Sequence, residues 1–315
     1  GHFIGDIPTK DTYAQEMTNM MVGHAVNLNI DRPEPVDPKP RIEVKNVTVR
    51  SEDGVPKLQD VSFTAMSGEI LGIAGISGSG QKELLEAIAG LQPVESGSIC
   101  YIEDDGSRDE LLGKDPLAIA DKGITLSFVP EDRLGMGLVG TMNLSDNMML
   151  RSFRNGKGIF TDRKSPRRLA KQVVKDLNVK TPSIDTPVRK LSGGNVQKIL
   201  VGREISSAPT VLMAAYPVRG LDINSSYTIY NLLNDQKKNG ASIIFVGEDL
   251  DVMLSLCDKI MVICHGKLQG VVNSDHTTKE DIGLMMTGTL NIVNKEGKTD
   301  GIAKDSAFTD EEGKA

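Results

Sequence analysis

An apolar run that leads into a glycine-rich loop limits the folds open to this chain more than any other feature. The run covers residues 69–76, and the loop reads Gly75-Ile-Ser-Gly-Ser-Gly-Gln-Lys82. Residues 81–91 then place apolar side chains at helical spacing. Strand, glycine loop and helix in this order form the context of a phosphate-binding loop, which holds anions with backbone N–H groups and the positive end of the helix. The segment therefore predicts a phosphate site in an α/β fold.

Other apolar segments predict the sheets around this loop. Residues 41–50 and 58–65 alternate apolar and polar side chains, as half-exposed antiparallel strands do. Apolar runs without alternation are typical of a parallel sheet that is covered on both faces, and further runs of this kind lie at 124–129, 211–215, 242–247 and 260–264. Residues 143–189 are mainly polar with helical spacing, which indicates an inserted helical subdomain.

Composition narrows the function classes. A net charge of −7 argues against a general nucleic-acid binder. No apolar run approaches the roughly 18–20 residues that cross a bilayer and no secretory signal is present, so we expect a cytoplasmic protein whose membrane role comes through a partner. Cys257 and Cys264 lack CxxC spacing and lie among apolar residues, so together with Cys100 they favour a reducing compartment over a metal site.

Residues 1–23 resemble residues 266–288. The two segments share a frame of glycines, one threonine and a Met-Met pair, and the second copy closes the main domain. Internal repeats report duplicated units. We therefore expect residues 1–30 to be the last hairpin and helix of an upstream, related domain.

The remaining boundaries follow from composition. Four prolines in residues 31–40 predict a stiff, extended linker. The main domain then covers residues 41–290, with its helical subdomain at about 135–191. Residues 291–315 are rich in charged residues and glycine and predict a disordered tail.

The groups that would hydrolyse a nucleotide at the glycine loop are replaced. Gln81 stands where phosphate loops carry a lysine, whose charge is worth about 4 kcal/mol at about 4 Å and an effective dielectric near 20. Lys82 takes the place of the hydroxyl that binds Mg²⁺. Ala215 and Tyr216 replace the carboxylates that would hold Mg²⁺ and polarise water. We expect phosphate binding without efficient chemistry, or else a tight turn without a ligand.

Two acidic residues occupy positions where a different residue type is usual. Glu248 follows a strand where a histidine would face the γ-phosphate, and we expect a solvated acid at a helix start. Glu131, in the segment 128–133, stands where a glutamine is common. It is expected to hold a cation or water, or to pair structurally with Arg133.

By contrast, the run Leu191-Ser-Gly-Gly-Asn195, called the signature below, carries no such replacement. Ser192 and the Gly193-Gly194 backbone can approach an anion closely and open a helix, which makes a second phosphate cradle. Alone, Ser-Gly-Gly is only a flexible helix cap. Its place after the glycine loop and before an apolar strand favours the functional interpretation.

These motifs together resemble the ATP-binding subunits of bacterial ABC importers for simple sugars and nucleosides, which carry two fused nucleotide-binding domains. The resemblance covers nearly all of residues 1–290 and is to the second, C-terminal domain, in which a degenerate phosphate loop accompanies an intact signature. It implies an α/β, ABC-type P-loop NTPase with a RecA-like mixed sheet core, an antiparallel β subdomain and an inserted helical subdomain. Lys82 and Tyr216 depart from the family pattern.

The resemblance also implies roles for individual residues. Nucleotide binding in the chain's own pocket falls to Gly75, Ser77, Gly78, Ser79, Gly80, Gln81, Lys82 and Glu131, with no catalytic or metal-binding residue there. The signature for the ATP of the partner domain comprises Leu191, Ser192, Gly193, Gly194 and Asn195, and Asp222 makes a dimer contact. ATP is the expected cofactor, with Mg²⁺ at the partner-domain site only.

The implied partners are the upstream nucleotide-binding domain of the same natural chain, a membrane permease and, indirectly, a solute-binding protein. The chain would lie at the inner face of the cell membrane and act as an ATPase in the full assembly, but not alone. Two alternatives stay open: a soluble tandem ABC regulatory protein without a permease, and a pseudo-ATPase scaffold that binds no nucleotide. The residues leave the transported substrate open.

Overall fold

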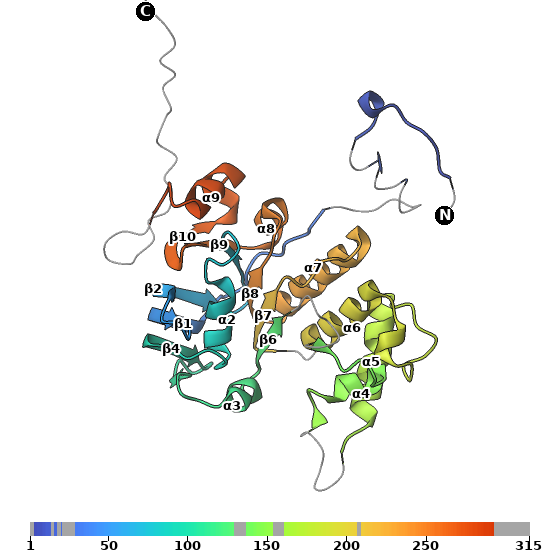
Figure 1. The fold of residues 1–315 in the computed structure, drawn as a ribbon, viewed down its shortest axis with the longest axis horizontal. Helices are drawn as coiled ribbons and strands as arrows, with labels where there is room; N and C mark the ends of the chain where they lie inside the picture. Colours follow the sequence, from blue (N-terminus) through green and yellow to red (C-terminus); the bar gives the residue numbers. More distant parts are fainter. Residues whose placement is uncertain are drawn as a thin grey trace, which may run out of the picture.

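The structure, a computed structural model, describes residues 3–13, 16, 17, 20, 29–128, 137–153, 161–206 and 209–292. Two β-sheets with their covering helices form one side of the molecule, and a helical lobe forms the other (Figure 1). The lobe contains α4 (Leu144–Met149), α5 (Lys164–Asp176) and α6 (Gly193–Ile205). None of the helices in the described part of the chain has the length and apolar composition needed to span a membrane.

The larger sheet carries the glycine loop. Its strands lie in the order β10-β9-β3-β8-β7-β6, and all are parallel except β10. Their bounds are β3 Ile70–Ala74, β6 Ile124–Phe128, β7 Val211–Ala215, β8 Ser242–Val246, β9 Lys259–Cys264 and β10 Lys267–Asn273. Every residue of β3, β7 and β8 is buried. The parallel sheet predicted from the apolar runs is confirmed.

The smaller sheet is antiparallel, in the order β2-β1-β4-β5. Its strands are β1 Pro40–Arg50, β2 Pro56–Met66, β4 Ser96–Ile102 and β5 Arg108–Glu110. Buried and less buried positions alternate along much of β1 and β2, because one face of the sheet packs on the core. The alternation at 41–50 and 58–65 thus predicted both strands correctly.

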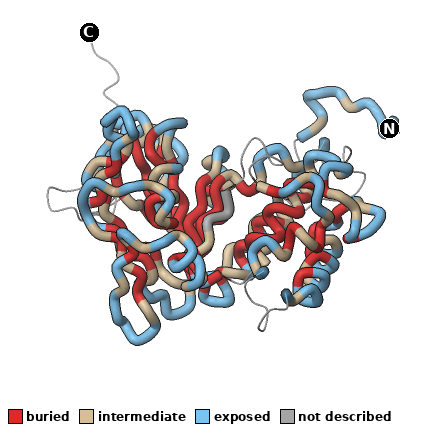
Figure 2. Tube along the Cα trace, turned by 60° about the horizontal axis from the view of Figure 1, so that its bottom comes forward, coloured by how far each residue is buried: buried red, intermediate tan, exposed pale blue. Residues whose placement is uncertain are grey.

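Two hydrophobic cores hold these layers together (Figure 2). The first lies between the two sheets and includes the buried face of α2 (Gln81–Ile88) and Ile119 of α3 (Pro116–Asp121). The second runs from the helical lobe along α7 (Ile223–Lys238) and α8 (Leu250–Leu256) to α9 (Lys279–Met286). Cys257 and Cys264 are both buried, Cys257 within the second core, and Cys100 is partly exposed.

The C-terminal half of α6 packs closely on α5. A Cβ on Gly202 would lie 2.4 Å from Cγ1 of Val173, so only glycine allows this helix separation. Glu204, also on α6, is buried and accepts hydrogen bonds from Arg203 and from Arg151. The fold class predicted from the sequence is confirmed, since mixed sheet, antiparallel sheet and helical lobe are all present.

The N-terminal segment shares two local features with the repeat with which it aligns, although residues 3–8 form no strand where the second copy has β10. The 3₁₀ turn η1 (Thr9–Asp11) stands at the position of η5 (Ser274–His276) in the 266–288 copy. Gly5 and its counterpart Gly270 have φ angles of 158° and 157°. A local resemblance in sequence is therefore matched by a local resemblance in conformation.

Candidate functional site

The loop between β3 and α2 requires its glycines. Gly78 and Gly80 have φ angles of 82° and 108°, in a region that residues with a Cβ rarely adopt. A Cβ on Gly80 would also lie 2.6 Å from both the Lys57 carbonyl oxygen and Cδ2 of Leu58. The resulting turn brings the chain directly into the N-terminus of α2.

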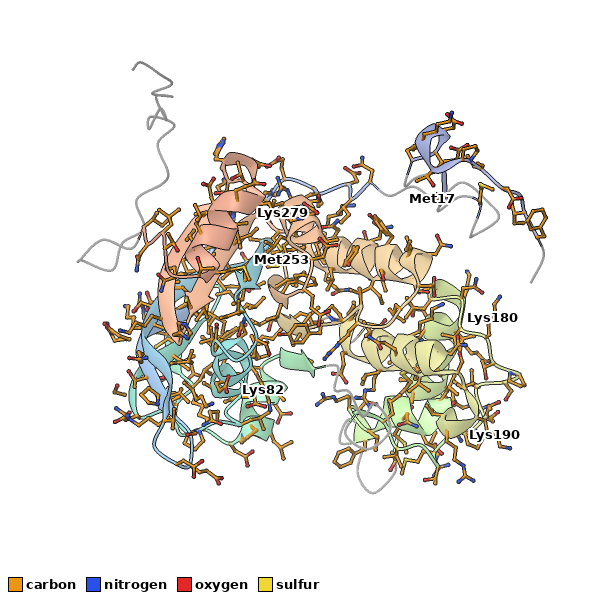
Figure 3. The ribbon with its side chains drawn as sticks, turned by 45° about the horizontal axis from the view of Figure 1, so that its top comes forward. Met17, Lys82, Lys180, Lys190, Met253 and Lys279 are labelled. Carbon is orange, nitrogen blue, oxygen red and sulfur yellow. The ribbon has the colours of Figure 1, made fainter. Side chains whose placement is uncertain are left out.

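The two polar residues at the start of α2 do not bring a positive charge to this loop. Gln81 is 5% exposed, and its Nε2 donates to the carbonyl of Ile76 within the loop at 3.3 Å. Lys82 lies on the exposed side of α2, and its Nζ is 3.6 Å from Glu86 Oε1 one turn along the helix (Figure 3). The Lys82 ammonium is thus paired on the helix surface with Glu86.

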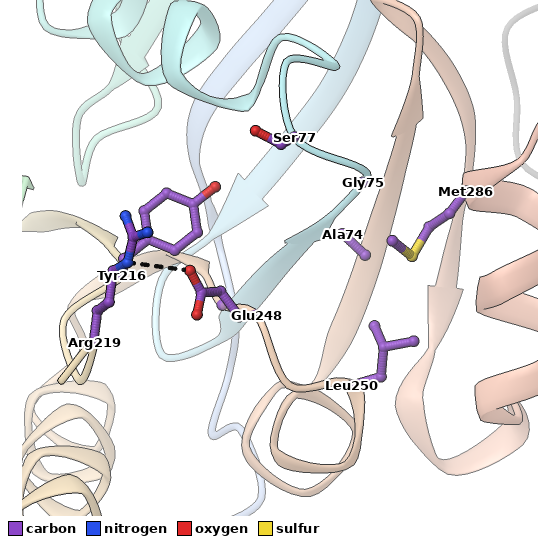
Figure 4. A pocket seen from close by; sticks show the side chains of 9 residues that line it. Ala74, Gly75, Ser77, Tyr216, Arg219, Glu248, Leu250 and Met286 are labelled. Atoms are coloured by element: carbon purple, nitrogen blue, oxygen red, sulfur yellow. Dashed lines mark ion pairs between the residues drawn. The ribbon is translucent and has the colours of Figure 1, made fainter. Parts of the chain in front are cut away.

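A cavity of about 430 Å³ opens beside the loop (Figure 4). The loop and β3 form one wall, while Tyr216, Arg219 and Glu248 come from the ends of β7 and β8. Arg219 Nε lies 3.5 Å from Glu248 Oε1. The residues that line the cavity are Ala74, Gly75, Ser77, Tyr216, Arg219, Gly247, Glu248, Leu250 and Met286.

The prediction for Glu248 is corrected in one respect. Its side chain is solvated, but the helix start belongs to Asp249, which accepts hydrogen bonds from the N–H groups of Asp251 and Val252. Asp249 is the better N-cap because its short side chain reaches the first-turn N–H groups. Glu248 instead faces the guanidinium of Arg219, so its charge is partly balanced.

The residues around the cavity do not fit a divalent cation. Ala215 has no side-chain oxygen to offer, and Tyr216 sits at φ 52° with its N–H bonded to Val246 O. Burial raises the pKa of the Tyr216 hydroxyl above its ordinary value, and the Glu248 carboxylate raises it further. A neutral phenol is a poor ligand for Mg²⁺, which prefers carboxylates and water. Among the described residues no cluster of His, Cys, Asp or Glu is arranged to hold a metal.

The same residues do fit a phosphate group. Gly75 packs so closely on the carbonyl of Ile263 and the amide of Gln81 that a Cβ would lie 2.5 and 2.6 Å from them, so internal packing requires glycine here. Ser79 is 2% exposed, and its hydroxyl has no hydrogen-bond partner in the described structure. An unsatisfied buried hydroxyl beside a backbone cradle at a helix N-terminus suits an anionic oxygen atom.

The signature run opens α6 on the surface. Ser192 is the N-cap residue, and Ser192 and Gly193 are exposed. The Ser192 hydroxyl accepts a hydrogen bond from Asn195 Nδ2 at 2.8 Å, and no side chain caps the first turn of this helix. Asn195 in turn accepts a hydrogen bond from the Lys180 N–H at 2.9 Å. The first N–H groups of α6 therefore point outward without an internal side-chain partner.

Gly194 adds a second observation. A Cβ at this position would meet nothing within 4 Å, and the residue lies in a helix where φ is negative. Packing within the chain thus gives no reason for glycine here. An anion that approaches the backbone from outside does give one.

One hydrogen bond connects the signature helix to the turn after β7, and others fix the start of α7. Gln197, fully buried on α6, donates from Nε2 to the carbonyl of Pro217 at 3.0 Å. Asp222 is the N-cap of α7 and accepts hydrogen bonds from the N–H and hydroxyl of Ser225. Burial would raise the pKa of the Asp222 carboxyl, but the hydrogen bonds from Ser225 outweigh it and hold the pKa below its ordinary value.

The sequence-predicted residues thus fall into two places. The glycine-loop residues lie at the cavity or just beneath it, while residues 191–195 open on the helical lobe beside Lys180 and Lys190 (Figures 1 and 3). Glu131 lies outside the described residues. Sequence reasoning missed the Arg219–Glu248 pair and the Gln197 contact, because both join positions more than 15 residues apart and neither has a local signal.

The ABC transporter family model matches residues 58–217. Curated relatives include the glucose import ATP-binding protein of Haloferax volcanii, 36% identical over 293 residues, which cover 91% of this chain and 52% of the relative. The guanosine import ATP-binding protein of Bacillus subtilis is 31% identical over 305 residues, covering 96% and 58%. The chain spans about half the length of the curated relatives that it matches.

Solved structures share the fold. A dimeric ATP-binding cassette in a post-hydrolysis state with ADP and phosphate aligns with a TM-score of 0.63 and 21% identity, covering 74% of this chain and 98% of the cassette. An ATP-binding cassette in its ADP conformation aligns with a TM-score of 0.60 and 19% identity, covering 79% and 95%.

Proposed function

The chain belongs to the ABC transporter family, and on this basis we propose that it is the second nucleotide-binding domain of an importer for simple sugars or nucleosides. Its role is to complete the ATP site of a partner domain with residues 191–195. Several relatives are named for import of a sugar or a nucleoside, among them glucose, guanosine and xylose. The transported substrate itself is set by other subunits.

The observation that carries the proposal is the uncapped first turn of α6. Its N–H groups face outward, and Gly194 leaves the backbone open to an approaching ligand. The positive end of a 13-residue helix adds to the attraction for an anion. The γ-phosphate of an ATP held by another domain has the charge and the oxygen atoms that this surface fits.

The chain's own pocket is a second nucleotide site that turns over slowly or not at all. The loop backbone and the Ser79 hydroxyl bind phosphate oxygens, but Gln81 supplies no charge and no carboxylate follows β7. Tyr216, which takes the place of the usual glutamate, does not serve as a base for water activation, since its phenol stays protonated at neutral pH. Mg²⁺ is expected at the partner-domain site only.

Two observations support the proposed partners. The 1–23 repeat shares both sequence and local backbone with the end of this domain, which favours an upstream related domain in the natural chain. The import relatives favour a membrane permease and a solute-binding protein, with the chain held at the inner face of the membrane through the permease. Asp222, at the start of α7, is the proposed contact with the upstream domain.

The decisive experiment measures ATP hydrolysis by this chain alone and mixed with the upstream domain of its natural chain. Alone, the chain should bind ATP but show negligible turnover. In the mixture, turnover should appear and should be abolished by Ser192→Arg, which fills the outward face of α6.

The matched control is Gln81→Ala, which alters the chain's own pocket and should leave turnover in the mixture largely unchanged. Robust turnover by the isolated chain that is lost with Gln81→Ala but kept with Ser192→Arg would contradict the proposal. An isolated chain that binds no ATP would point to a nucleotide-free scaffold for this pocket.

A further inference from the structure

The proline-rich segment in front of β1 is attached to the domain at several points besides the strand itself. Arg32 Nη1 donates to the carbonyls of Leu254 at 3.3 Å and Cys257 at 2.5 Å, at the end of α8. Arg32 Nη2 pairs with the carboxylate of Asp275. One guanidinium thus contacts three acceptors, and its side chain is only 15% exposed.

A buried lysine provides the second attachment. Lys237, in the last turn of α7, has a side chain that is 1% exposed and lies 2.6 Å from Asp258 Oδ1. It also donates to the carbonyl oxygen of Pro33. A buried ammonium needs acceptors for its three N–H groups, because an unsatisfied charge in the interior is costly. The segment supplies one of these acceptors from its backbone.

Neighbouring contacts extend the same pattern. Asn234, one turn before Lys237, donates from Nδ2 to the carbonyl of Asp31 at 3.1 Å, and Ile30 packs against the core that contains α7 and α8. Proline has no N–H, so a proline-rich segment mainly offers carbonyl acceptors. The surface that receives it presents an amide and an ammonium as donors to these carbonyls, and two carbonyls and a carboxylate as acceptors for Arg32. The chemistry of the two sides is complementary.

We propose that the ends of α7 and α8 form an intramolecular docking surface whose occupant is the segment Ile30–Pro33. We call this segment the strap. Docking fixes the point at which the preceding part of the chain leaves the domain, so an upstream domain would be held at a set position on the face formed by α7 and α8. The strap is thus part of this domain and not a free tether.

The docking surface also touches the strand that carries the glycine loop. Asp258, the partner of Lys237, accepts a hydrogen bond on Oδ2 from the N–H of Ile70 at 2.7 Å. Ile70 is the first residue of β3, which ends at the loop. One carboxylate is therefore shared between the strap anchor and the start of this strand.

The first test is a thermal unfolding cycle on the full chain with Arg32→Ala, Lys237→Met and the double variant. Arg32→Ala should lower Tm by roughly 5 °C. The double variant should lose clearly less than the sum of the single losses, because the first change already releases the strap. Lys279→Ala, which breaks the exposed ion pair with Asp251 near the same surface, is the control and should shift Tm by no more than about 1 °C.

The second test measures the mobility of the strap directly and does not depend on how well Lys237→Met folds. A nitroxide is attached within the strap at Asp31→Cys, whose side chain is exposed, in a Cys100→Ser background, since Cys257 and Cys264 are buried. The label should be immobile in this background, become mobile with Arg32→Ala, and stay immobile with Lys279→Ala. A label that is already mobile without Arg32→Ala, or additive losses of Tm in the cycle, would overturn the proposal. Both readouts are independent of ATP and of the proposed transport role.

Discussion

Replacing Gly194 with alanine should separate the stability of the chain from its activity. The residue lies in the first turn of α6, has helical φ, and has room for a Cβ. Alanine is favoured over glycine in a helix by about 0.5–1 kcal/mol, so Gly194→Ala should raise Tm by about 1–3 °C. On the proposed function, however, the added methyl group stands between the helix backbone and the phosphate of the partner's ATP.

The expected loss of turnover follows from one hydrogen bond. A charge-assisted bond from a backbone N–H is worth about 1.5–3 kcal/mol, which corresponds to roughly a 10- to 150-fold fall in rate. The assay is ATP hydrolysis by the chain mixed with its upstream domain, next to urea unfolding of the chain alone. Gly283→Ala is a matched control, because Gly283 also lies in a helix with open space around it but on α9.

Gly283→Ala should therefore raise stability similarly and leave turnover unchanged. If both variants hydrolyse ATP at the parent rate, the signature does not contact a phosphate and the argument from Gly194 is wrong. If Gly194→Ala destabilises the chain, the Cβ position of Gly194 is not surrounded by open space. Only a gain in stability together with a loss of turnover agrees with the reasoning.

Three further predictions concern the chain alone. Gly78→Ala strains only the backbone and should lower the free energy of unfolding, measured in urea, by about 1–2 kcal/mol. Gly80→Ala should lower it by at least about 3 kcal/mol, because its Cβ also meets neighbouring atoms, and equal losses would refute this. Asp222→Ala should lower the free energy of unfolding by about 1 kcal/mol at neutral pH. This difference from the parent should vanish as pH falls through the lowered pKa of the Asp222 carboxyl, below 3.8, because only the carboxylate form is preferentially stabilised in the folded state. A thiol reagent at pH 8 should label Cys100 before Cys257, since burial raises the pKa of the Cys257 thiol; mass spectrometry of the digest gives the order, and early labelling of Cys257 would contradict it.

The strands and the glycine loop could be predicted because their signals are local. An apolar run of five residues, as in β3, β7 and β8, reports burial on both faces from the sequence itself. The glycines of the loop report a backbone that only glycine adopts easily. The predicted N-cap of α8 was wrong by one residue, because Glu248 and Asp249 are both acids and only side-chain length distinguishes them.

The strap could not be predicted in the same way. Lysine is rarely buried, so nothing in the sequence marks Lys237 as an interior residue. Its acceptor on Pro33 is a backbone carbonyl 204 positions away, and every residue has such a group. Composition predicted the extended shape of residues 31–40 but not that side chains of the folded domain would bind it.

The hydrogen bond from Gln197 to Pro217 gives the degenerate pocket a structural use. Gln197 belongs to the helix that presents the signature, and Pro217 follows the strand on which Ala215 and Tyr216 replaced the usual carboxylates. On the proposed function, a shift of that turn would be felt by the helix that carries residues 191–195. A pocket without catalytic chemistry would then still couple its own occupancy by nucleotide to the surface offered to the partner domain.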